Sequence, residues 1–239
     1  MPGGAYSALS GMRQRLEELD RIAADLANAS TAGYKSERRS TVSSAREFAS
    51  ALDSAVDVVA GRTKVDFRPG TMATTGRDLD VAIDGKGFFV VETEAGPRYT
   101  RNGGFTRRAD GVLSTPQGEP ILGDGGPIKL APGPVVIEGD GTVRSGAAVA
   151  GRIQVVEFAS EAQLQRESGA RFMAIPGVTP AEADTPRLIG GTLEQSNVSI
   201  VDAMAALTEV TRGFDSLQRG ASVLMNELDG RAISELGKR

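Results

Sequence analysis

The chain has 239 residues, which is enough for one large domain or two modest domains with a buried core. It contains no cysteine and no histidine, a composition that excludes thiol nucleophiles, imidazole bases, disulfides and the common zinc, copper and non-haem iron sites. A net charge of −4 argues against a nucleic-acid partner, and contents of 40% hydrophobic and 24% charged residues are typical of a folded protein.

The N-terminal segment, residues 1–34, is predicted to be helical. It opens with Met1-Pro2-Gly3-Gly4, which has neither the basic nor the apolar region of a secretory signal peptide, so no cleaved signal is expected. Its apolar residues recur at alternating spacings of four and three, the pattern of a coiled-coil seam. The seam residues are Ala5, Leu9, Met12, Leu16, Leu19, Ala23 and Leu26.

Residues 35–76 are predicted to be a connector. Lys35, Arg38 and Arg39 form a small basic cluster, which indicates a solvated surface. Apolar residues within 48–59 recur at helical spacing and predict a short helix.

Residues 77–190 are predicted to form an all-β domain of many short strands. The region 61–190 holds 21 of the 30 glycines and 10 of the 11 prolines, so turns are frequent there. Asn102-Gly103 stands between two strand-like segments and predicts a hairpin.

Three carboxylates in this region were considered as catalytic groups. Asp78, Asp80 and Asp84 share one face of a predicted strand, where two carboxylates could serve a glycosidase-like reaction. Their alternation with Leu79, Val81 and Ile83 strongly favours a solvated polar face opposite a buried apolar one. The sequence offers no catalytic constellation, phosphate-binding loop or metal-ligand spacing, so no cofactor, metal or small-molecule substrate is expected.

The C-terminal segment, residues 191–239, is predicted to contain a second helix with a seam of its own. No apolar run approaches the ~18 residues that a membrane span needs. The seam residues are Ile200, Ala203, Leu207, Val210, Phe214, Leu217, Ala221, Leu224 and Leu228. The predicted fold is therefore α+β, with the N- and C-terminal helices forming a coiled-coil domain and a central all-β domain of many short strands.

Three parts of the chain resemble signatures of the bacterial flagellar rod, hook and hook-associated axial proteins. The first is residues 25–35, which end in Thr31-Ala32-Gly33-Tyr34-Lys35, although Asp25 stands where the family usually has Asn. The second is residues 79–89 with residues 99–105. The third is Glu194-Gln195-Ser196-Asn197-Val198, followed by Asp202-Ala203-Met204.

This resemblance, which covers almost the whole chain, implies a structural subunit of the flagellar basal-body rod. Many copies would stack helically into a torque-transmitting drive shaft that crosses the periplasm. It also implies export through the flagellar type III apparatus without a cleaved signal peptide. The implied partners are copies of this chain and other rod proteins, with no reaction and no cofactor. Chain length favours the proximal rod type with one β domain, and the distal rod type is the alternative.

The predicted assembly interface lies mainly on the two seams. An isolated pair of helices would leave much apolar surface in water, and polymerisation through non-closing contacts would cover it. The predicted interface residues are Leu9, Met12, Leu16, Leu19, Leu26, Asn28, Leu207, Val210, Phe214, Leu217, Leu224 and Leu228.

Two functions of other classes stay open on the sequence. A coiled-coil dimer could present the β domain as a ligand-binding module, which discrete dimers that never extend would support. A carboxylate-dependent enzyme would need Asp78, Asp80 and Asp84 together in one concave pocket.

Overall fold

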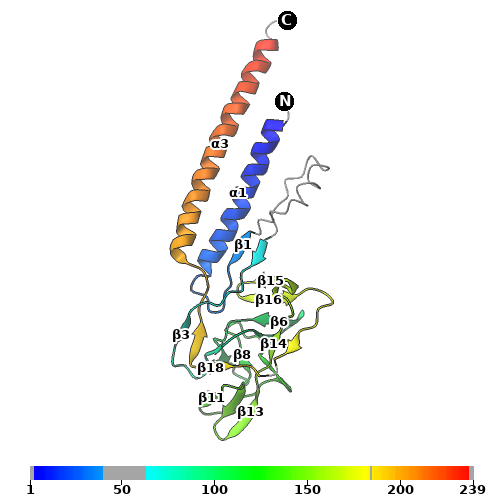
Figure 1. Cartoon of the computed structure of the whole chain (residues 1–239), viewed down its shortest axis with the longest axis vertical. Helices are drawn as coiled ribbons and strands as arrows, with labels where there is room; N and C mark the ends of the chain where they lie inside the picture. The colour runs from blue at the N-terminus through cyan, green and yellow to red at the C-terminus, as the bar shows by residue number, and fades with distance from the viewer. Residues whose placement is uncertain (1–2, 40–62, 184, 237–239) are drawn as a thin grey trace. The chain divides into compact units, whose positions relative to one another are not determined.

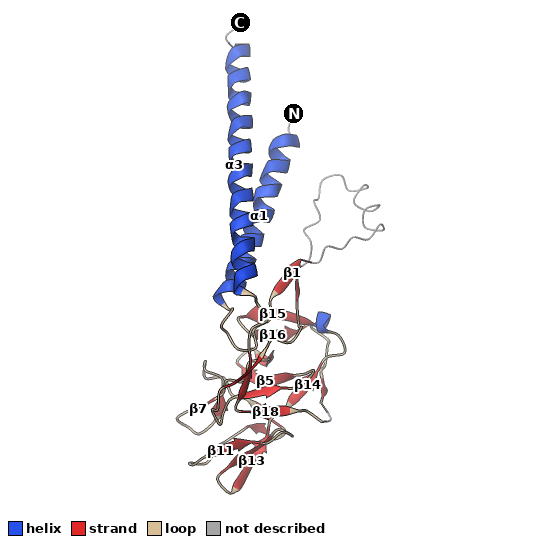
Figure 2. Cartoon of the chain, turned by 60° about the vertical axis from the view of Figure 1, so that its left-hand side comes forward, coloured by secondary structure: helices blue, strands red, loops and turns tan. Residues whose placement is uncertain are grey.

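The computed structural model describes residues 3–39, 63–183 and 185–236. The chain divides into two compact units, of which one contains the long helices and the other comprises residues 28–38 and 64–198. Figure 2 shows that the long helices come from the two ends of the chain and the strands from between them. The short helix predicted within 48–59 lies outside the described residues.

The helical unit contains α1 (Gly3–Ala27) and α3 (Ile200–Leu236). These two helices lie side by side and run in opposite directions (Figure 1). Ser199 caps the start of α3, because its hydroxyl oxygen accepts a 3.3 Å hydrogen bond from the backbone nitrogen of Asp202. Among the described residues, no helix is both long and apolar enough to span a lipid bilayer.

The two helices approach each other closely where one of them carries glycine. A Cβ atom on Gly11 would lie 3.7 Å from Cδ1 of Leu217, and one on Gly213 would lie 3.5 Å from Nε of Arg15. The missing side chains therefore make room for a longer side chain of the opposite helix.

The prediction of a coiled-coil domain is wrong. The described residues contain one long helix near each end and a β-rich body, and burial on α1 does not follow its heptad. On α1 the seam residue Ala23 is exposed and Leu16 is 47% exposed, whereas Ile22, which lies off the seam, is buried. An ordinary helix has 3.6 residues per turn, so a strict seven-residue stripe drifts round its surface by about 20° per heptad. A straight antiparallel contact at glycines therefore does not bury the whole stripe.

The β-rich unit fits the predicted central β domain. Its largest sheet has six strands in the order β15-β16-β6-β5-β14-β17, and a second sheet has three in the order β11-β12-β13. The six strands are β5 (Phe88–Thr93), β6 (Gly96–Thr100), β14 (Val155–Glu157), β15 (Leu164–Ser168), β16 (Arg171–Ala174) and β17 (Ala181–Glu182). The three strands are β11 (Val135–Ile137), β12 (Thr142–Ser145) and β13 (Ala148–Arg152).

The remaining described strands form short two-stranded sheets. One 3-10 helix, η1 (Glu161–Gln163), precedes β15. The pairs are β1 (Glu37–Arg39) with β2 (Thr63–Val65), β3 (Met72–Thr74) with β19 (Thr192–Glu194), β4 (Val81–Ile83) with β18 (Leu188–Gly190), β7 (Thr106–Arg107) with β8 (Leu113–Ser114), and β9 (Leu122–Gly123) with β10 (Gly126–Pro127).

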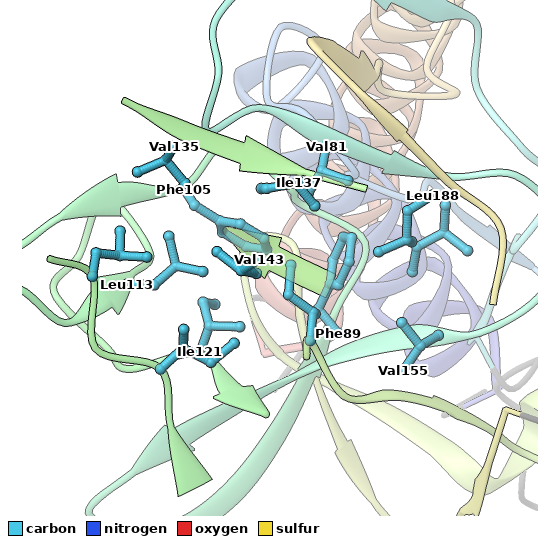
Figure 3. Packing of buried hydrophobic residues seen from close by; sticks show 14 of the residues in the cluster. Val81, Phe89, Phe105, Leu113, Ile121, Val135, Ile137, Val143, Val155 and Leu188 are labelled. Carbon is cyan, nitrogen blue, oxygen red and sulfur yellow. The ribbon is translucent and has the colours of Figure 1, made fainter. Parts of the chain in front are cut away.

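The six-stranded sheet is buried on both faces at its centre, along β5. Successive side chains of a strand point to opposite faces, so the run Phe88-Phe89-Val90-Val91 on β5 supplies both cores. Figure 3 shows the larger core, in which the rings of Phe89 and Phe105 meet edge to face with centroids 5.1 Å apart. Burial of each such side chain stabilises the folded state by about 1.5–3 kcal/mol. The β-rich unit therefore has a hydrophobic core of its own.

Candidate assembly site

The predicted interface residues on the helices differ in their exposure. Leu16 is exposed, whereas Val210 is buried and Leu217 packs over Gly11 within the chain. Asn28 is half-buried and belongs to the β-rich unit. The other half-buried members are Met12, Leu19, Leu26, Leu207 and Phe214, and the side chains of Leu9, Leu224 and Leu228 lie outside those described.

Sequence reasoning missed several strongly exposed apolar side chains of the helical unit. Val201 is 76% exposed and Met204 is 54% exposed, and Ile200 beside them is also exposed. These three residues stand at i, i+1 and i+4, so they share one side of α3 and form what we call the α3 patch. Only Ile200 belongs to the predicted seam. A search for apolar residues outside the heptad would have found the other two.

The signatures that resemble the axial proteins meet inside the β-rich unit, although 159 positions separate Lys35 from Glu194. We call the place where they meet the motif junction, which consists of residues 33–36, 66–70, 101 and 194–197. The backbone nitrogen of Gly33 donates a 2.7 Å hydrogen bond to the carbonyl oxygen of Glu194. The chain segment that follows α1 is thereby fastened to the segment that precedes α3.

A buried group of three charges lies at the centre of the motif junction. Lys35 Nζ donates to Oε1 of Glu194 and, at 3.0 Å, to the carbonyl oxygen of Arg68. Glu194 Oε1 also accepts a 3.0 Å hydrogen bond from the nitrogen of Gly70, and its Oε2 lies 3.6 Å from Nη1 of Arg101. Lys35 and Glu194 are each only 1% exposed. Two buried cations therefore share one buried anion, and the expectation that Lys35 is solvated is wrong.

Asn197 joins three backbone segments at the same junction. Its Nδ2 donates to the carbonyl oxygens of Asp66 at 2.7 Å and Arg68 at 3.1 Å, and its Oδ1 accepts from the nitrogen of Ser36 at 2.7 Å. Both donors and the acceptor of the side-chain amide are thus used. Nothing in a single sequence pairs positions this far apart, so sequence reasoning did not place Glu194, Arg101 and Asn197 together with Lys35.

Arg166 covers the outer side of the junction. Its Cζ lies 4.4 Å from the ring centroid of Tyr34, and its Nε lies 2.7 Å from Oε1 of Glu37. Its guanidinium also donates to the carbonyl oxygen of Lys35. The aromatic ring in the first signature therefore serves as a platform for a cation from β15.

The free energy of unfolding is expected to rise with pH because of Lys35. Burial is the largest influence on Lys35 and lowers its pKa, while the carboxylate of Glu194 partly offsets that effect. Between this lowered pKa and the value of about 10.4 in an unfolded chain, the unfolded chain binds more protons, so stability rises with pH. Urea unfolding of the wild type and Lys35→Met should show a difference that grows in favour of the wild type toward about pH 10. Parallel pH profiles would contradict this.

Gly33→Ala is expected to lower the free energy of unfolding by about 1–3 kcal/mol more than Gly76→Ala does. Both glycines have positive φ, 67° and 71°, so both substitutions carry the cost of a left-handed conformation. Only at Gly33 would the new Cβ meet backbone, 2.3 Å from the carbonyl carbon of Arg101, since Gly76 has no atom within 4 Å. Urea unfolding followed by tyrosine fluorescence measures both variants. Equal losses of unfolding free energy in the two variants would contradict this prediction, because they would show that the backbone at residue 101 moves to accommodate the new Cβ.

The three acidic residues considered as catalytic groups are not equivalent. Asp80 is buried, and its Oδ2 accepts a 2.7 Å hydrogen bond from the hydroxyl of Thr75 while Oδ1 lies 3.5 Å from Nη1 of Arg77. Asp78 and Asp84 are exposed. The prediction of a uniformly solvated face is therefore wrong at Asp80, whose carboxylate holds neighbouring loops instead.

Two family models match the chain, each over a different region. The model described as the flagellar hook protein FlgE/F/G D1 domain matches residues 82–167. The model described as the flagellar basal body rod FlgEFG protein C-terminal matches residues 189–222. The first range lies within the β-rich unit, and the second contains part of the motif junction and the start of α3.

Curated relatives match nearly the whole length. The flagellar basal-body rod protein FlgF of Caulobacter vibrioides is 34% identical over 100% of this chain and 99% of its own. FlgF of Salmonella typhimurium is 31% identical over 97% of each chain, and FlgG of Bacillus subtilis is 31% identical over 88% of this chain and 90% of its own. The chain therefore belongs to the FlgE/F/G family of flagellar basal-body rod and hook proteins, which confirms the resemblance seen in its signatures.

Proposed function

We propose that this chain is a structural subunit of the flagellar basal-body rod. The observation that carries the proposal is the match, over almost the full length, to proteins named as basal-body rod proteins. A structural role needs no reacting groups, and the buried charges of the motif junction are bonded to one another and to backbone. The rival enzyme function has no support from Asp78, Asp80 and Asp84, because only one of them is buried.

Assembly through the helical unit is the second part of the proposal. The α3 patch and Leu16 leave apolar surface in water, and a neighbouring subunit would cover it. The predicted interface residues that are half-buried, such as Leu217, would support this surface by fixing the pair of helices from within. We propose that this contact joins unlike surfaces without closing into a ring, because such contacts produce an open helical array rather than a discrete dimer.

The proximal rod type is proposed over the distal type. Five relatives named FlgF match between 90% and 100% of this chain, and a relative named FlgG matches 88% of it. We further propose that the protein reaches the periplasmic rod through the flagellar type III export apparatus, with other rod proteins as its neighbours.

Purified basal bodies test the proposed function directly. Cells that carry an epitope-tagged copy in place of the native gene should yield basal bodies labelled on the rod. Cells that lack the gene should have no filaments and should regain motility when it is restored. Basal bodies without label, from motile cells that make the tagged protein, would contradict the proposal.

A further inference from the structure

The β-rich unit contains a cavity of about 690 Å³ with an excess of positive charge, which we call the basic cavity. Five basic side chains line it, against the three carboxylates of Asp66, Asp84 and Glu161. The basic residues are Arg38, Lys64, Arg68, Lys86 and Arg101.

The carboxylates of the cavity do not neutralise its cations. Asp66 is shared, since its Oδ2 lies 2.7 Å from Nε of Arg38 and 2.8 Å from Nη2 of Arg68. Lys64 and Lys86 form no ion pair with any residue that the structure describes. Two lysines at the mouth are therefore available to a negatively charged ligand.

Arg101 gives the cavity a buried cation as well. It is 9% exposed, and its Nε has no hydrogen-bond partner among the described residues. Its Nη1 shares the carboxylate of Glu194 with Lys35, so the motif junction beside the cavity also carries one more positive than negative charge. The other guanidinium nitrogens are engaged, since Nη2 donates to the carbonyl oxygen of Gly85 at 2.7 Å and Nη1 faces Glu194, so an incoming carboxylate would give a partner to Nε.

The lining is apolar as well as basic. Phe67 and Val65 are half-buried there, and Met72 is 41% exposed. A small inorganic anion would leave this apolar surface uncovered. A peptide segment that carries carboxylates on a short backbone would use both features.

One exposed turn of the same chain has the complementary chemistry. The β5–β6 hairpin carries Glu92 near the end of β5 and Glu94 in the turn itself. Both are exposed and form no ion pair with described residues. The hairpin holds the turn in one shape, because Thr93 pairs with Gly96 and its hydroxyl donates to the carbonyl oxygen of Gly96 at 2.7 Å. A preformed turn loses little conformational entropy on binding.

We propose that the basic cavity of one copy receives the β5–β6 turn of a second copy, with Glu92 and Glu94 facing Lys64, Lys86 and Arg101. This inference rests on the proposed function, because rod assembly brings copies together. The chain as a whole has net charge −4, so the basic cavity is the local exception to which an acidic turn of another copy is attracted. Donor and acceptor are different surfaces, so the contact can repeat along an array.

Charge reversal tests the contact in cells. Lys64→Glu with Lys86→Glu, and separately Glu92→Lys with Glu94→Lys, should each lower incorporation into basal bodies roughly tenfold, because attraction becomes repulsion. The chain that carries all four substitutions should regain incorporation, since its cavity and turn are again opposite in charge. All the substituted side chains are exposed, and circular dichroism should show unchanged folding. Normal incorporation of both double variants, or no recovery in the fourfold variant, would overturn the proposal.

Disulfide trapping gives a second readout, because the natural chain has no cysteine. Oxidised basal bodies from cells that co-express Lys86→Cys and Glu94→Cys chains should contain a cross-linked dimer. The matched control pairs Lys86→Cys with Asp124→Cys, an exposed acidic position in another turn, and should give none. Labelled basal bodies with no dimer, or with equal dimer in the control, would overturn the contact and leave the proposed function standing. Absence of the tagged wild type from basal bodies would overturn both.

Discussion

Glu194→Gln is expected to lower the free energy of unfolding of the β-rich unit by about 3–5 kcal/mol. The substitution keeps the size of the side chain but removes the one anion that Lys35 and Arg101 share. Two cations would then stay close together and buried without a counter-charge. Urea unfolding followed by tyrosine fluorescence is a suitable measurement, because two of the three tyrosines, Tyr34 and Tyr99, are buried in this unit.

The order of variants in a double-mutant cycle separates this charge effect from lost packing. Lys35→Met leaves Arg101 and Glu194 as a neutral pair, so its loss of stability should be smaller than that of Glu194→Gln. The variant that carries both Lys35→Met and Glu194→Gln leaves Arg101 as the one buried cation of this group. It should therefore be more stable than Glu194→Gln alone. The matched control is Glu94→Gln, an exposed carboxylate in the turn after β5, with an expected change within about 0.5 kcal/mol. Additive losses would show that the three charges act independently.

The β-rich body could be predicted because its signals are local. Glycine and proline mark the turns, and the apolar run at residues 88–91 marks a strand buried on both faces. The hairpin at Asn102-Gly103 was predicted on the same grounds and is wrong, since β6 pairs with β5 and β16 while β7 pairs with β8. A Cβ on Gly103 would lie 1.7 Å from the carbonyl oxygen of Val81, so this glycine permits a close approach to β4.

The motif junction could not be predicted because its signals are not local. Lys35 stands in a cluster with Arg38 and Arg39, and basic residues in a connector are usually solvated. Only the fold brings Glu194 to it, from the other end of the chain. Asp80 was misread for the same reason, because the groups that bury it come from the loops at Thr75 and Gly191.

The helices were located correctly, but the buried face of α1 was not. A heptad shows which residues are apolar, and it does not show whether the contact with the other helix follows the stripe. Glycine at positions 11 and 213 sets the contact between α1 and α3, and the α3 patch lies outside it. The heptad therefore left out Val201 and Met204, to which we assign part of the proposed assembly contact.

Val201→Asp with Met204→Asp is expected to abolish incorporation into the rod and to leave the free subunit folded. Both side chains are more than half exposed, so the substitutions should change the free energy of unfolding of the monomer by no more than about 0.5 kcal/mol each. In the assembled rod, the two carboxylates would lie in an apolar contact with a neighbouring subunit. A buried, unpaired charge costs several kcal/mol, which is enough to prevent a contact that repeats in every subunit. The measurement is the amount of each variant in purified basal bodies, together with its level in the cell and the presence of filaments.

Two control variants separate lost apolar contact from added charge. Val201→Leu with Met204→Leu keeps the α3 patch apolar and should be incorporated. Thr211→Asp with Ser216→Asp adds the same charge to exposed polar positions of α3 and should also be incorporated, because it removes no apolar surface. Normal incorporation of Val201→Asp with Met204→Asp would show that the α3 patch faces solvent in the rod and that assembly uses another surface. Failure of the Thr211→Asp with Ser216→Asp control would instead show that charge anywhere on α3 is excluded, which would extend the interface beyond the α3 patch.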